Sequence, residues 1–365
     1  MIRRGVLYIM KFLGNSSQDP NFFLRIALVG LLGPLAGVLA WSAAHAGEPA
    51  RQPAPALSAL GRKLFFDARL SRDGSVSCSS CHQPAHAFTD GRKVSVGVGK
   101  RIGTRNTPSL LNVFDGEPLF WDGRRDRLEV AVLDPLTNPV EMGQPDLDTL
   151  TRRISERPDY QSAIASAFPG TRRPSGAQLG AAIAAFIRSL PQQRSAYDRY
   201  AAGQHDALAF DAADGLRLFD GKAGCSGCHR MDAARFTDGQ FHHSGVGLRG
   251  VDSHLGELTT QAMQRDLQGS ALGNDVAQHA ERSALGRFMV SHNAVDVGAF
   301  RTPSLRNVAA TAPYMHDGSI GTLEEAVDTE IYYRGLSTGR PIALTVEERR
   351  HLLAFLRSLT AAPGR

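Results

Sequence analysis

The sequence predicts a mostly α-helical protein composed of two tandem domains related by internal duplication. Three observations predict this fold class. The pentapeptide C-x-x-C-H occurs twice, at residues 78–82 and 225–229. Five sequence blocks recur in the same order around the two pentapeptides. Each copy closes with an apolar pattern of helical spacing, and no strand-like alternation of apolar and polar residues is evident.

The repeated blocks bring the two copies into register. The first copy contains Gly61–Phe65, Phe88–Gly91, Thr107–Val113, Trp121–Gly123 and Ala185–Leu190, and the second contains Gly215–Phe219, Phe236–Gly239, Thr302–Val308, His316–Gly318 and Ala354–Leu359. The boundary between the copies falls near residues 191–210. We therefore expect a first domain over residues 57–200 and a second over residues 201–365.

A helix is expected at the end of each copy. The apolar residues at helical spacing are Leu179, Ile183, Phe186, Ile187 and Leu190 in the first copy and Leu352, Leu353, Leu356 and Leu359 in the second. Thr345, followed three residues later by Glu348, predicts a capping box at the start of the second helix.

The C-x-x-C-H pentapeptide is the attachment motif of c-type haem. Two thiols one turn apart can form thioethers to the two vinyl groups of one porphyrin, and the adjacent His can bind the iron as an axial ligand. The predicted ligand sets are Cys78, Cys81 and His82 for the first haem and Cys225, Cys228 and His229 for the second. A redox-active C-x-x-C pair does not need the His in both copies, and a zinc site would have to join two distant cysteine pairs.

Two covalent haems also agree with the rest of the composition. The four cysteines of the chain all lie in the two motifs, which leaves none for a disulfide. Gly and Pro are plentiful, at 37 and 19 residues, and indicate much ordered loop. We therefore expect cytochrome-c-like domains, in which the porphyrin supplies much of the apolar core.

The beginning of the chain has the features of a signal peptide over residues 1–46. The uncharged apolar run Ile26–Trp41 precedes Ala44–Ala46, an A-x-A-type cleavage site. This run is shorter than the ~20 residues of a membrane span, although an uncleaved anchor is the alternative. Cleavage would leave a Pro/Ala linker at residues 47–56 and a periplasmic protein without a stable membrane span. Export agrees with c-type haem, which is attached outside the bacterial cytoplasm.

The charge pattern excludes one class of function. Much of the net charge of +5 lies in the first 46 residues, and no concentrated basic run appears after them. We therefore expect no nucleic-acid binding.

The order of the motifs resembles that of the bacterial di-haem cytochrome c peroxidases, above all their MauG-like branch. The matching segments are CSSCH, TPSLLN, FWDGR, NPVEMG, CSGCH, FTDG, TPSLRN and APYMHDGS. They extend over nearly all of residues 57–360. In that family, peroxide reacts at the N-terminal haem and the C-terminal haem receives or stores electrons. A Trp lies between the haems, and a calcium ion occupies the domain interface.

The resemblance implies catalytic roles for two residues. Trp121, in FWDGR, matches the inter-haem Trp, whose indole can relay electrons. Glu141, in NPVEMG, matches the acid of the distal pocket, and its carboxylate can move a proton from the inner to the outer peroxide oxygen. From the residues alone, a core Trp and a surface Glu at a turn are the alternatives.

The resemblance also implies a calcium site. Asn106 matches the side-chain ligand of the ion, and Thr311 and Pro313 match positions that offer backbone carbonyls. Such hard oxygen donors suit Ca²⁺.

Two departures from the family concern the first haem. Classical members have a distal His at the position of Val98. Because Val98 cannot bind iron, we expect this haem to be open on its distal side, as in the MauG-like branch. His86 is the nearest substitute, but so close after His82 it is expected on the proximal side or at the surface. Ala131 stands where many members have a Gln, so one hydrogen-bond donor to peroxide is missing.

The sixth ligand of the second haem has several candidates. The family uses a Met or, in the MauG-like branch, a Tyr at the position of Glu330. Tyr332 aligns best with that Tyr on the Arg-Gly that follows. Tyr333 and Glu330, one helical turn apart, are rivals. Met315 and Met289 are the Met candidates.

These residues predict an exported oxidoreductase that reacts with hydrogen peroxide at the N-terminal haem. Its electrons would come from a protein donor, a small cytochrome c or copper protein, or from Trp or Tyr side chains of a protein substrate, as in the MauG-like branch. A non-enzymatic di-haem electron-transfer cytochrome is the alternative, and Glu141 and Val98 argue against it. The sequence leaves the oligomeric state open, although homodimers are frequent in this family.

Overall fold

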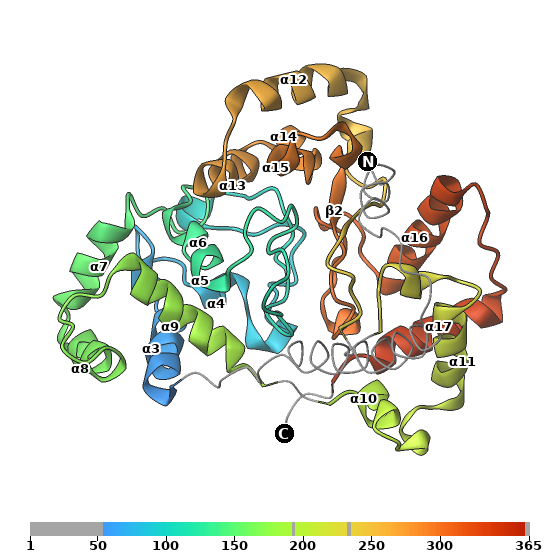
Figure 1. Ribbon diagram of the computed structural model, residues 1–365, viewed down its shortest axis with the longest axis horizontal. Helices are drawn as coiled ribbons and strands as arrows, with labels where there is room; N and C mark the ends of the chain where they lie inside the picture. The colour runs from blue at the N-terminus through green and yellow to red at the C-terminus, as the bar shows by residue number, and fades with distance from the viewer. Residues whose placement is uncertain (1–53, 192–193, 232–234, 362–365) are drawn as a thin grey trace, which may run out of the picture. The chain divides into compact units, whose positions relative to one another are not determined.

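The computed structural model describes residues 54–191, 194–231 and 235–361. These residues are mostly helical, with long loops between the helices (Figure 1). Within them, a single small antiparallel sheet pairs β1 (Phe241–His243) with β2 (Ala299–Arg301). The predicted mostly helical fold is confirmed for the described part of the chain.

The first copy is organised around two crossed helices, α3 and α9. Its helices are α3 (Pro55–Phe66), α4 (Cys78–Cys81), α5 (Leu128–Ala131), α6 (Asp134–Thr137), α7 (Leu147–Ser155), α8 (Pro158–Ala167) and α9 (Gly176–Arg188). An added Cβ at Gly61 would overlap the carbonyl oxygen of Ala182 in α9. Only glycine therefore permits this approach of the two backbones.

The second copy repeats this crossing with α11 and α17. Its helices are α10 (Ala196–Ala201), α11 (Phe210–Asp220), α16 (Leu323–Thr338) and α17 (Val346–Ser358). An added Cβ at Gly215 would overlap the carbonyl oxygen of His351. The capping box is confirmed, because Thr345 Oγ1 accepts the Glu348 N–H at 3.1 Å and Glu348 Oε2 accepts the Thr345 N–H at 2.7 Å.

Repeated phenylalanines pack in the same way in both copies. The ring centroids of Phe65 and Phe186 are 5.1 Å apart, and those of Phe219 and Phe355 are also 5.1 Å apart. Phe65 and Phe219 are almost fully buried. The repeated G-x-x-x-F block thus supplies both the helix crossing and the aromatic contact beneath it.

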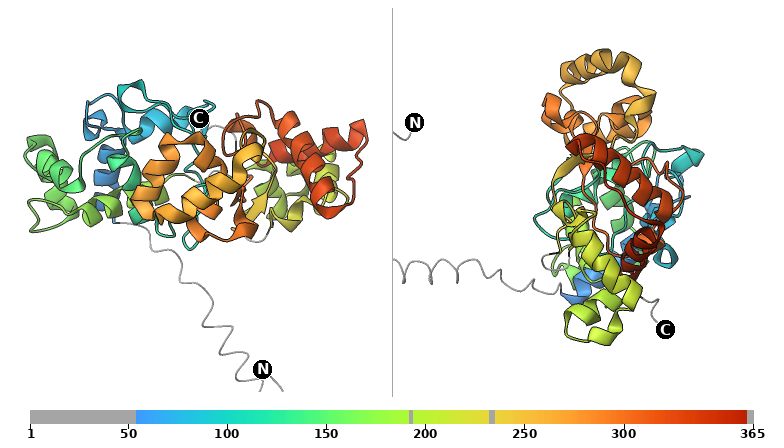
Figure 2. Two further views of the ribbon diagram at one scale, coloured as in Figure 1. Left: turned by 90° about the horizontal axis from the view of Figure 1, so that it is seen from above. Right: turned by 90° about the vertical axis from the view of Figure 1, so that its right-hand side faces the viewer.

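A third group of helices lies between β1 and β2 in the chain. It consists of α12 (Leu255–Arg265), α13 (Gly269–Gln278), α14 (Ala280–Ala284) and α15 (Phe288–Ser291). Leu272, Val276, Leu285 and Phe288 form a core of their own. Figure 1 shows α13 beside α6, and the side view in Figure 2 shows α12 and α10 at opposite ends. The repeat pattern did not predict this group, because the first copy has no counterpart.

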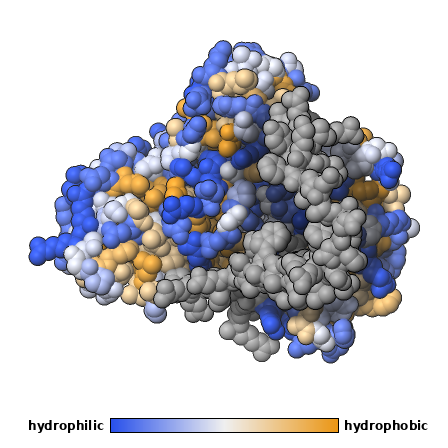
Figure 3. Space-filling view, viewed as in Figure 1, coloured by the Kyte–Doolittle hydropathy of each residue, from blue (hydrophilic) through white to orange (hydrophobic). Residues whose placement is uncertain are grey.

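Within residues 54–361, apart from the gaps given above, no helix is long and apolar enough to cross a membrane. In Figure 3, hydrophobic side chains are interspersed with hydrophilic ones over the visible face. The predicted signal peptide, residues 1–46, lies outside the described residues.

Candidate active site

The first C-x-x-C-H motif forms one helical turn, α4, with His82 directly after it. The Nδ1 atom of His82 lies 2.9 Å from the carbonyl oxygen of Phe88. Because a carbonyl only accepts hydrogen bonds, Nδ1 carries the ring proton and Nε2 keeps its lone pair. Burial lowers the pKa of His82, which keeps the imidazole neutral. His82 is therefore prepared to bind a metal through Nε2.

The second motif repeats this arrangement at His229. Its Nδ1 atom lies 3.0 Å from the carbonyl oxygen of Phe236, and burial lowers the pKa of His229 to about 4. Phe88 and Phe236 both begin the repeated FTDG block. The repetition of that block thus has a structural reason, since the carbonyl of its first residue orients the His of the C-x-x-C-H motif in each copy.

The cysteines have the environment of structural thiols. All four are unpaired, and burial raises the pKa of Cys78 and of Cys81 to about 12. Burial likewise raises the pKa of Cys225 to about 11. A redox-active thiol needs a lowered pKa, so a C-x-x-C redox pair fits poorly here. Thioether attachment to a porphyrin needs no such activation in the folded protein.

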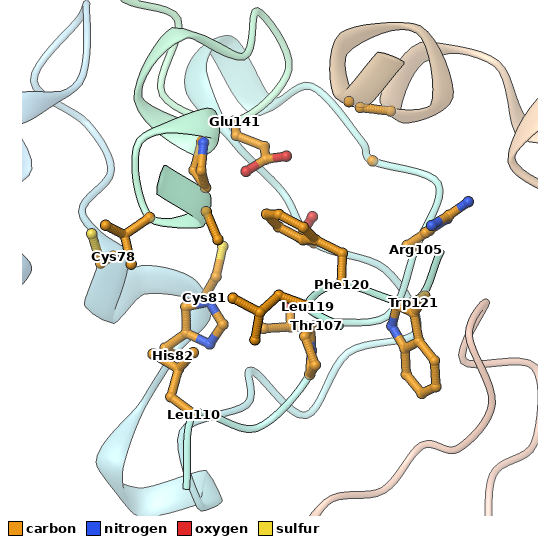
Figure 4. A pocket seen from close by; sticks show the side chains of 18 of the residues that line it. Cys78, Cys81, His82, Arg105, Thr107, Leu110, Leu119, Phe120, Trp121 and Glu141 are labelled. Atoms are coloured by element: carbon orange, nitrogen blue, oxygen red, sulfur yellow. The ribbon is translucent and has the colours of Figure 1, made fainter. Parts of the chain in front are cut away.

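The first motif opens onto a cavity with mostly apolar walls (Figure 4). The apolar lining residues include Phe65, Val76, Leu110, Val113, Leu119, Leu128, Ile183 and Ile187. Cys78, Cys81 and His82 lie together on one side of this cavity. Two thiols and an imidazole beside an apolar chamber fit a flat, covalently attached haem.

Glu141 faces the same cavity from the side away from His82 (Figure 4). The Nδ2 atom of Asn138 donates to Glu141 Oε1 at 2.9 Å. Burial raises the pKa of Glu141 to about 7, with Arg124 opposing the shift and Asp134 adding to it. The carboxyl group can therefore gain or lose a proton near neutral pH, as a proton-transferring group must.

Arg124 is a cavity residue to which sequence reasoning assigned no role. Its guanidinium lies 3.6 Å over the ring of Phe120, and its Nη1 pairs with Asp122 at 3.0 Å. Its buried Nε has no hydrogen-bond partner within the described residues. The sequence did contain one sign of a special role. The first copy has Arg124 in FWDGR, whereas the second copy has Ser319 at the matching position.

Neither Val98 nor Ala131, the two positions where the chain departs from the family, brings a polar side chain into the first cavity. Val98 is 1% exposed, and its N–H donates to the Glu141 carbonyl at 2.9 Å, but its side chain is not part of the cavity wall. Ala131 lines the wall without a polar side-chain atom. Within the described residues, His82 is the only histidine that lines the cavity, and His86 is exposed at the surface. The open distal side stays a prediction.

Trp121 lies where the two copies meet. Its Nε1–H donates to the carbonyl of Asn106 at 2.9 Å, and the Asn106 N–H donates to the carbonyl of His316 at 2.8 Å. In the other direction, the Arg301 N–H donates to the carbonyl of Trp121 at 2.9 Å. Asn106 and Arg301 are matching positions, as are Trp121 and His316. The copies therefore exchange the same hydrogen bond in both directions.

Of the three predicted calcium residues, Asn106 contacts the loop that carries the other two. Asn106 contacts the backbone of His316, which closely follows Thr311 and Pro313 in the same loop. The Nδ2 atom of Asn106 donates to the carbonyl of Arg92 at 2.9 Å, and its Oδ1 accepts no hydrogen bond from the described residues. An oxygen donor is thus left over, and the calcium ion stays a prediction.

Helix α16 faces the second motif. The Nη1 atom of Arg334 lies 3.1 Å from Cys228 Sγ. Glu330 is one helical turn earlier on the same side of the helix. Burial raises the pKa of Glu330, whereas the positive charge of Arg334 opposes that shift. The negative charge of Glu330 in turn raises the pKa of Cys225, so the carboxylate lies near this motif.

The other candidate ligands of the second haem are less favourably placed. Tyr332 is 56% exposed, and its ring contacts that of Tyr333 edge-on at 5.2 Å. The Tyr333 ring packs against Gly245, where an added Cβ would overlap it. Met289 is 2% exposed within the core of α12–α15, which separates it from the second motif. Met315 keeps the left-handed backbone of its counterpart in the first copy, Phe120.

One cluster of potential metal ligands appears in the part of the chain that is described. It contains Cys228, Asp238 and His242, and His242 Nε2 lies 2.8 Å from Asp238 Oδ2. Cys228 belongs to the second C-x-x-C-H motif, so a thioether at its sulfur would remove one of the three ligands. The cluster therefore marks the edge of the second motif rather than a separate metal centre.

Helix α13 covers the first cavity, which sequence reasoning missed. Gly273, Val276 and Ala277 line its wall, and Thr104 Oγ1 donates to the Val276 carbonyl at 2.7 Å. Ser270 Oγ donates to Asp134 at 2.8 Å. The only sign of it in the sequence was the length of one connection. Between the FTDG and TPSL blocks, the second copy has the long segment 240–301 and the first copy only the short segment 92–106.

Known proteins resemble this chain over most of its length. The profile of the di-haem cytochrome c peroxidase family matches residues 55–206. The chain is 38% identical over 318 residues to the methylamine utilization protein MauG of Methylorubrum extorquens, which covers 85% of this chain and 80% of the relative. It is 33% identical over 353 residues to the cytochrome-c peroxidase IdrP2 of Denitromonas iodatirespirans, with 93% of each chain covered.

Solved structures share the fold. A MauG-like protein associated with microbial copper homeostasis superposes with a TM-score of 0.68 at 33% identity, covering 86% of this chain and 92% of that one. The diheme peroxidase BthA of Burkholderia thailandensis superposes with a TM-score of 0.64 at 26% identity, covering 85% and 87%. Together with the C-x-x-C-H motif in each copy, these likenesses establish that the chain belongs to the di-haem cytochrome c peroxidase family, whose members are oxidoreductases that carry two haems and act on hydrogen peroxide.

Proposed function

We propose that this chain reduces hydrogen peroxide in the cavity of the first C-x-x-C-H motif. The observation that carries this proposal is the placement of Glu141 across the cavity from His82, with no second histidine among the described residues that form the wall. The haem bound by Cys78, Cys81 and His82 would supply the iron that binds peroxide and the redox chemistry that cleaves its O–O bond. The chain's own residues control proton transfer and access.

Glu141 moves the proton that O–O cleavage requires. A carboxylate near the cavity can take the proton of the inner peroxide oxygen and give it to the outer one, so that water leaves. The pKa of about 7 suits both steps, because the group is neither always protonated nor always ionised near neutral pH. Asn138 holds Oε1 in place, which leaves Oε2 to face the cavity.

Electrons travel between two tandem haem domains, residues 57–200 and 201–365, by way of Trp121. The equivalent packing of Gly61 and Gly215 and the exchanged hydrogen bonds around Trp121 support this organisation. An indole held at the junction between the copies can be oxidised and reduced in turn. A calcium ion bound by Asn106 with the carbonyls of Thr311 and Pro313 would stiffen that junction.

The electron source is a protein, and we favour a protein substrate whose Trp or Tyr side chains are oxidised. Val98 in place of a histidine supports this output, since the first haem then needs no prior reduction to become accessible. A small cytochrome c or copper protein is the other source. The enzyme works in the periplasm after residues 1–46 have been removed. Haem is attached to both motifs in that compartment.

Stopped-flow absorbance of the purified holoprotein, without added donor, tests the proposal. We expect peroxide to change the spectrum of the resting oxidised protein within the mixing time or shortly after. The Glu141→Gln variant should react far more slowly while keeping both haems, and Glu117→Gln, away from the cavity lining, is the matched control. A resting protein inert to peroxide, or a Glu141→Gln variant with unchanged rate, would contradict the proposal.

A further inference from the structure

The two copies stay in register beyond the motifs that reveal the duplication. The isolated bridge between Leu119 and Arg125 in the first copy recurs between Tyr314 and Ile320 in the second. Inside these turns, Phe120 and its counterpart Met315 share an unusual left-handed backbone, with φ values of +65° and +70°. The same turn therefore leads into the segment that follows in each copy.

The segments after these turns also match. Leu128–Val132 (LEVAV) corresponds to Leu323–Val327 (LEEAV) without an insertion. Leu128 opens α5 and Leu323 opens α16, and both side chains are buried. In the first copy, this segment forms a wall of the haem cavity. Its lining residues are Leu128, Ala131, Val132 and Pro135.

One position of this wall differs in its chemistry between the copies. Pro135 lines the first cavity and has no side-chain atom that could bind a metal. The position that corresponds to Pro135 in the second copy is Glu330. The second copy thus presents a carboxylate where the first copy presents an apolar ring.

The surroundings of Glu330 agree with this placement. Arg334 lies one turn further along α16, and its Nη1 atom is 3.1 Å from Cys228 Sγ. This face of the helix therefore faces the second motif. Glu330 makes no hydrogen bond or ion pair within 4 Å to any described residue, although Arg334 and His242 lie within electrostatic reach. Holding a half-buried carboxylate without a direct partner is costly unless something binds it.

We propose that the Glu330 carboxylate is the sixth ligand of the second haem iron, on the side opposite His229. The proposal rests on the second C-x-x-C-H motif carrying a haem. A carboxylate is a hard anionic oxygen donor that favours ferric iron, and axial ligands set the reduction potential of a haem. The second haem therefore has a low potential, which suits it to lose an electron to the first site. Arg334 offsets part of the negative charge.

The rival tyrosines make the first test possible on the unmodified protein. Resonance Raman spectra of the oxidised holoprotein show phenolate vibrations when a tyrosinate binds haem iron. We expect none, and their presence would overturn the proposal in favour of Tyr332 or Tyr333. The haems are counted first by pyridine haemochrome absorbance. Fewer than two per chain would overturn the haem assignment beneath the proposal, whereas the phenolate result concerns the ligand alone.

A second test changes the ligand. Glu330→Met should create the far-red absorption band of an iron–thioether bond, shift one haem toward low spin and raise its reduction potential. Tyr332→Phe and Tyr333→Phe are the controls, and each should leave the spectra and both potentials unchanged. The proposal is overturned if Glu330→Met leaves the second haem unaltered or if a Tyr→Phe variant alters it. Should Glu330→Met not incorporate haem, the Raman result on the unmodified protein still decides.

Discussion

The indole N–H of Trp121 donates to the carbonyl of Asn106 at 2.9 Å, and through that residue the indole is joined to the second copy, because the Asn106 N–H donates to the His316 carbonyl at 2.8 Å. Two hydrogen bonds in sequence therefore fix the orientation of the indole at the junction. A side chain placed by backbone groups of both copies keeps a constant distance to each copy, which suits the relay role proposed for Trp121.

Replacing Trp121 separates its structural role from its redox role. We expect Trp121→Phe to lose about 1 kcal/mol of unfolding free energy, as for one hydrogen bond. Transfer of oxidising equivalents to the second haem should slow much more than the reaction with peroxide, because phenylalanine is far harder to oxidise than indole. Rapid-mixing absorbance at the two haem bands measures both steps. Equal slowing of both steps would mean that Trp121 acts only through packing.

Glu141 should link activity and stability to pH in opposite directions. Its pKa is raised from 4.5 to about 7 in the folded protein, so the folded state binds the proton more tightly than the unfolded state. The stability contributed by this group is full below pH 4.5 and is lost as the pH rises through about 7. The peroxide reaction should rise over the same range, because the ionised carboxylate accepts the proton.

Glu141→Gln should abolish both trends. We expect the rate of the peroxide reaction to fall about 10²- to 10⁴-fold and to lose its pH dependence near neutrality. In thermal unfolding measured over the same pH series, the part of the stability that Glu141 contributes should no longer be lost between pH 4.5 and 7. A variant with the wild-type pH profile would assign the titration to another group.

Arg124 should tune the pKa of Glu141. Its positive charge favours the ionised carboxylate, so Arg124→Ala should move the midpoint of the pH–rate profile above that of the wild type. Arg124→Lys keeps the charge and should leave the midpoint nearly unchanged. Arg127→Ala removes an exposed charge close by in the chain and is the control. An unshifted midpoint in Arg124→Ala would show that the guanidinium does not act on Glu141.

The repeated glycine of the helix crossings should be intolerant of a methyl group. At Gly61 the added Cβ would overlap the Ala182 carbonyl, and at Gly215 it would overlap the His351 carbonyl. We expect each Gly→Ala change to lower the unfolding free energy by about 1–3 kcal/mol or more. Gly256→Ala is the matched control, because no atom lies within 4 Å of its added Cβ, and it should change stability by less than about 1 kcal/mol. Chemical denaturation of the holoproteins measures the difference.

The haem attachment sites could be predicted because their chemistry is local. Cys78, Cys81 and His82 are neighbours in the chain, so the spacing alone places two thiols and an imidazole where one porphyrin could bind all three. The duplication was equally visible, since the same packing of Gly61 and of Gly215 requires the same residue types. Glu141 and Trp121 came from a resemblance, and the structure finds both in the wall of the first cavity.

Other features depend on contacts between residues that are distant in the chain. Helix α13 covers the first cavity although it belongs to the second copy, and no local pattern announces where an inserted segment will dock. The environment of Arg124 Nε, which lies 3.8 Å from Asp134 Oδ2 and has no hydrogen-bond partner among the described residues, likewise depends on which carboxylates of other segments come near it. The position of Glu330 relative to Tyr332 depends on the rotation of α16, which is set by the core beneath it rather than by its own apolar pattern.

The sequence by itself determined the two C-x-x-C-H motifs, the duplication and the mostly helical fold, because covalent spacing and helical periodicity act within a few residues. Only the tertiary structure decided which carboxylate faces the first cavity, which helix covers it and which side of α16 faces the second motif. Those outcomes are set by packing between segments far apart in the chain, where small differences in contact and burial choose among arrangements that the local sequence allows equally.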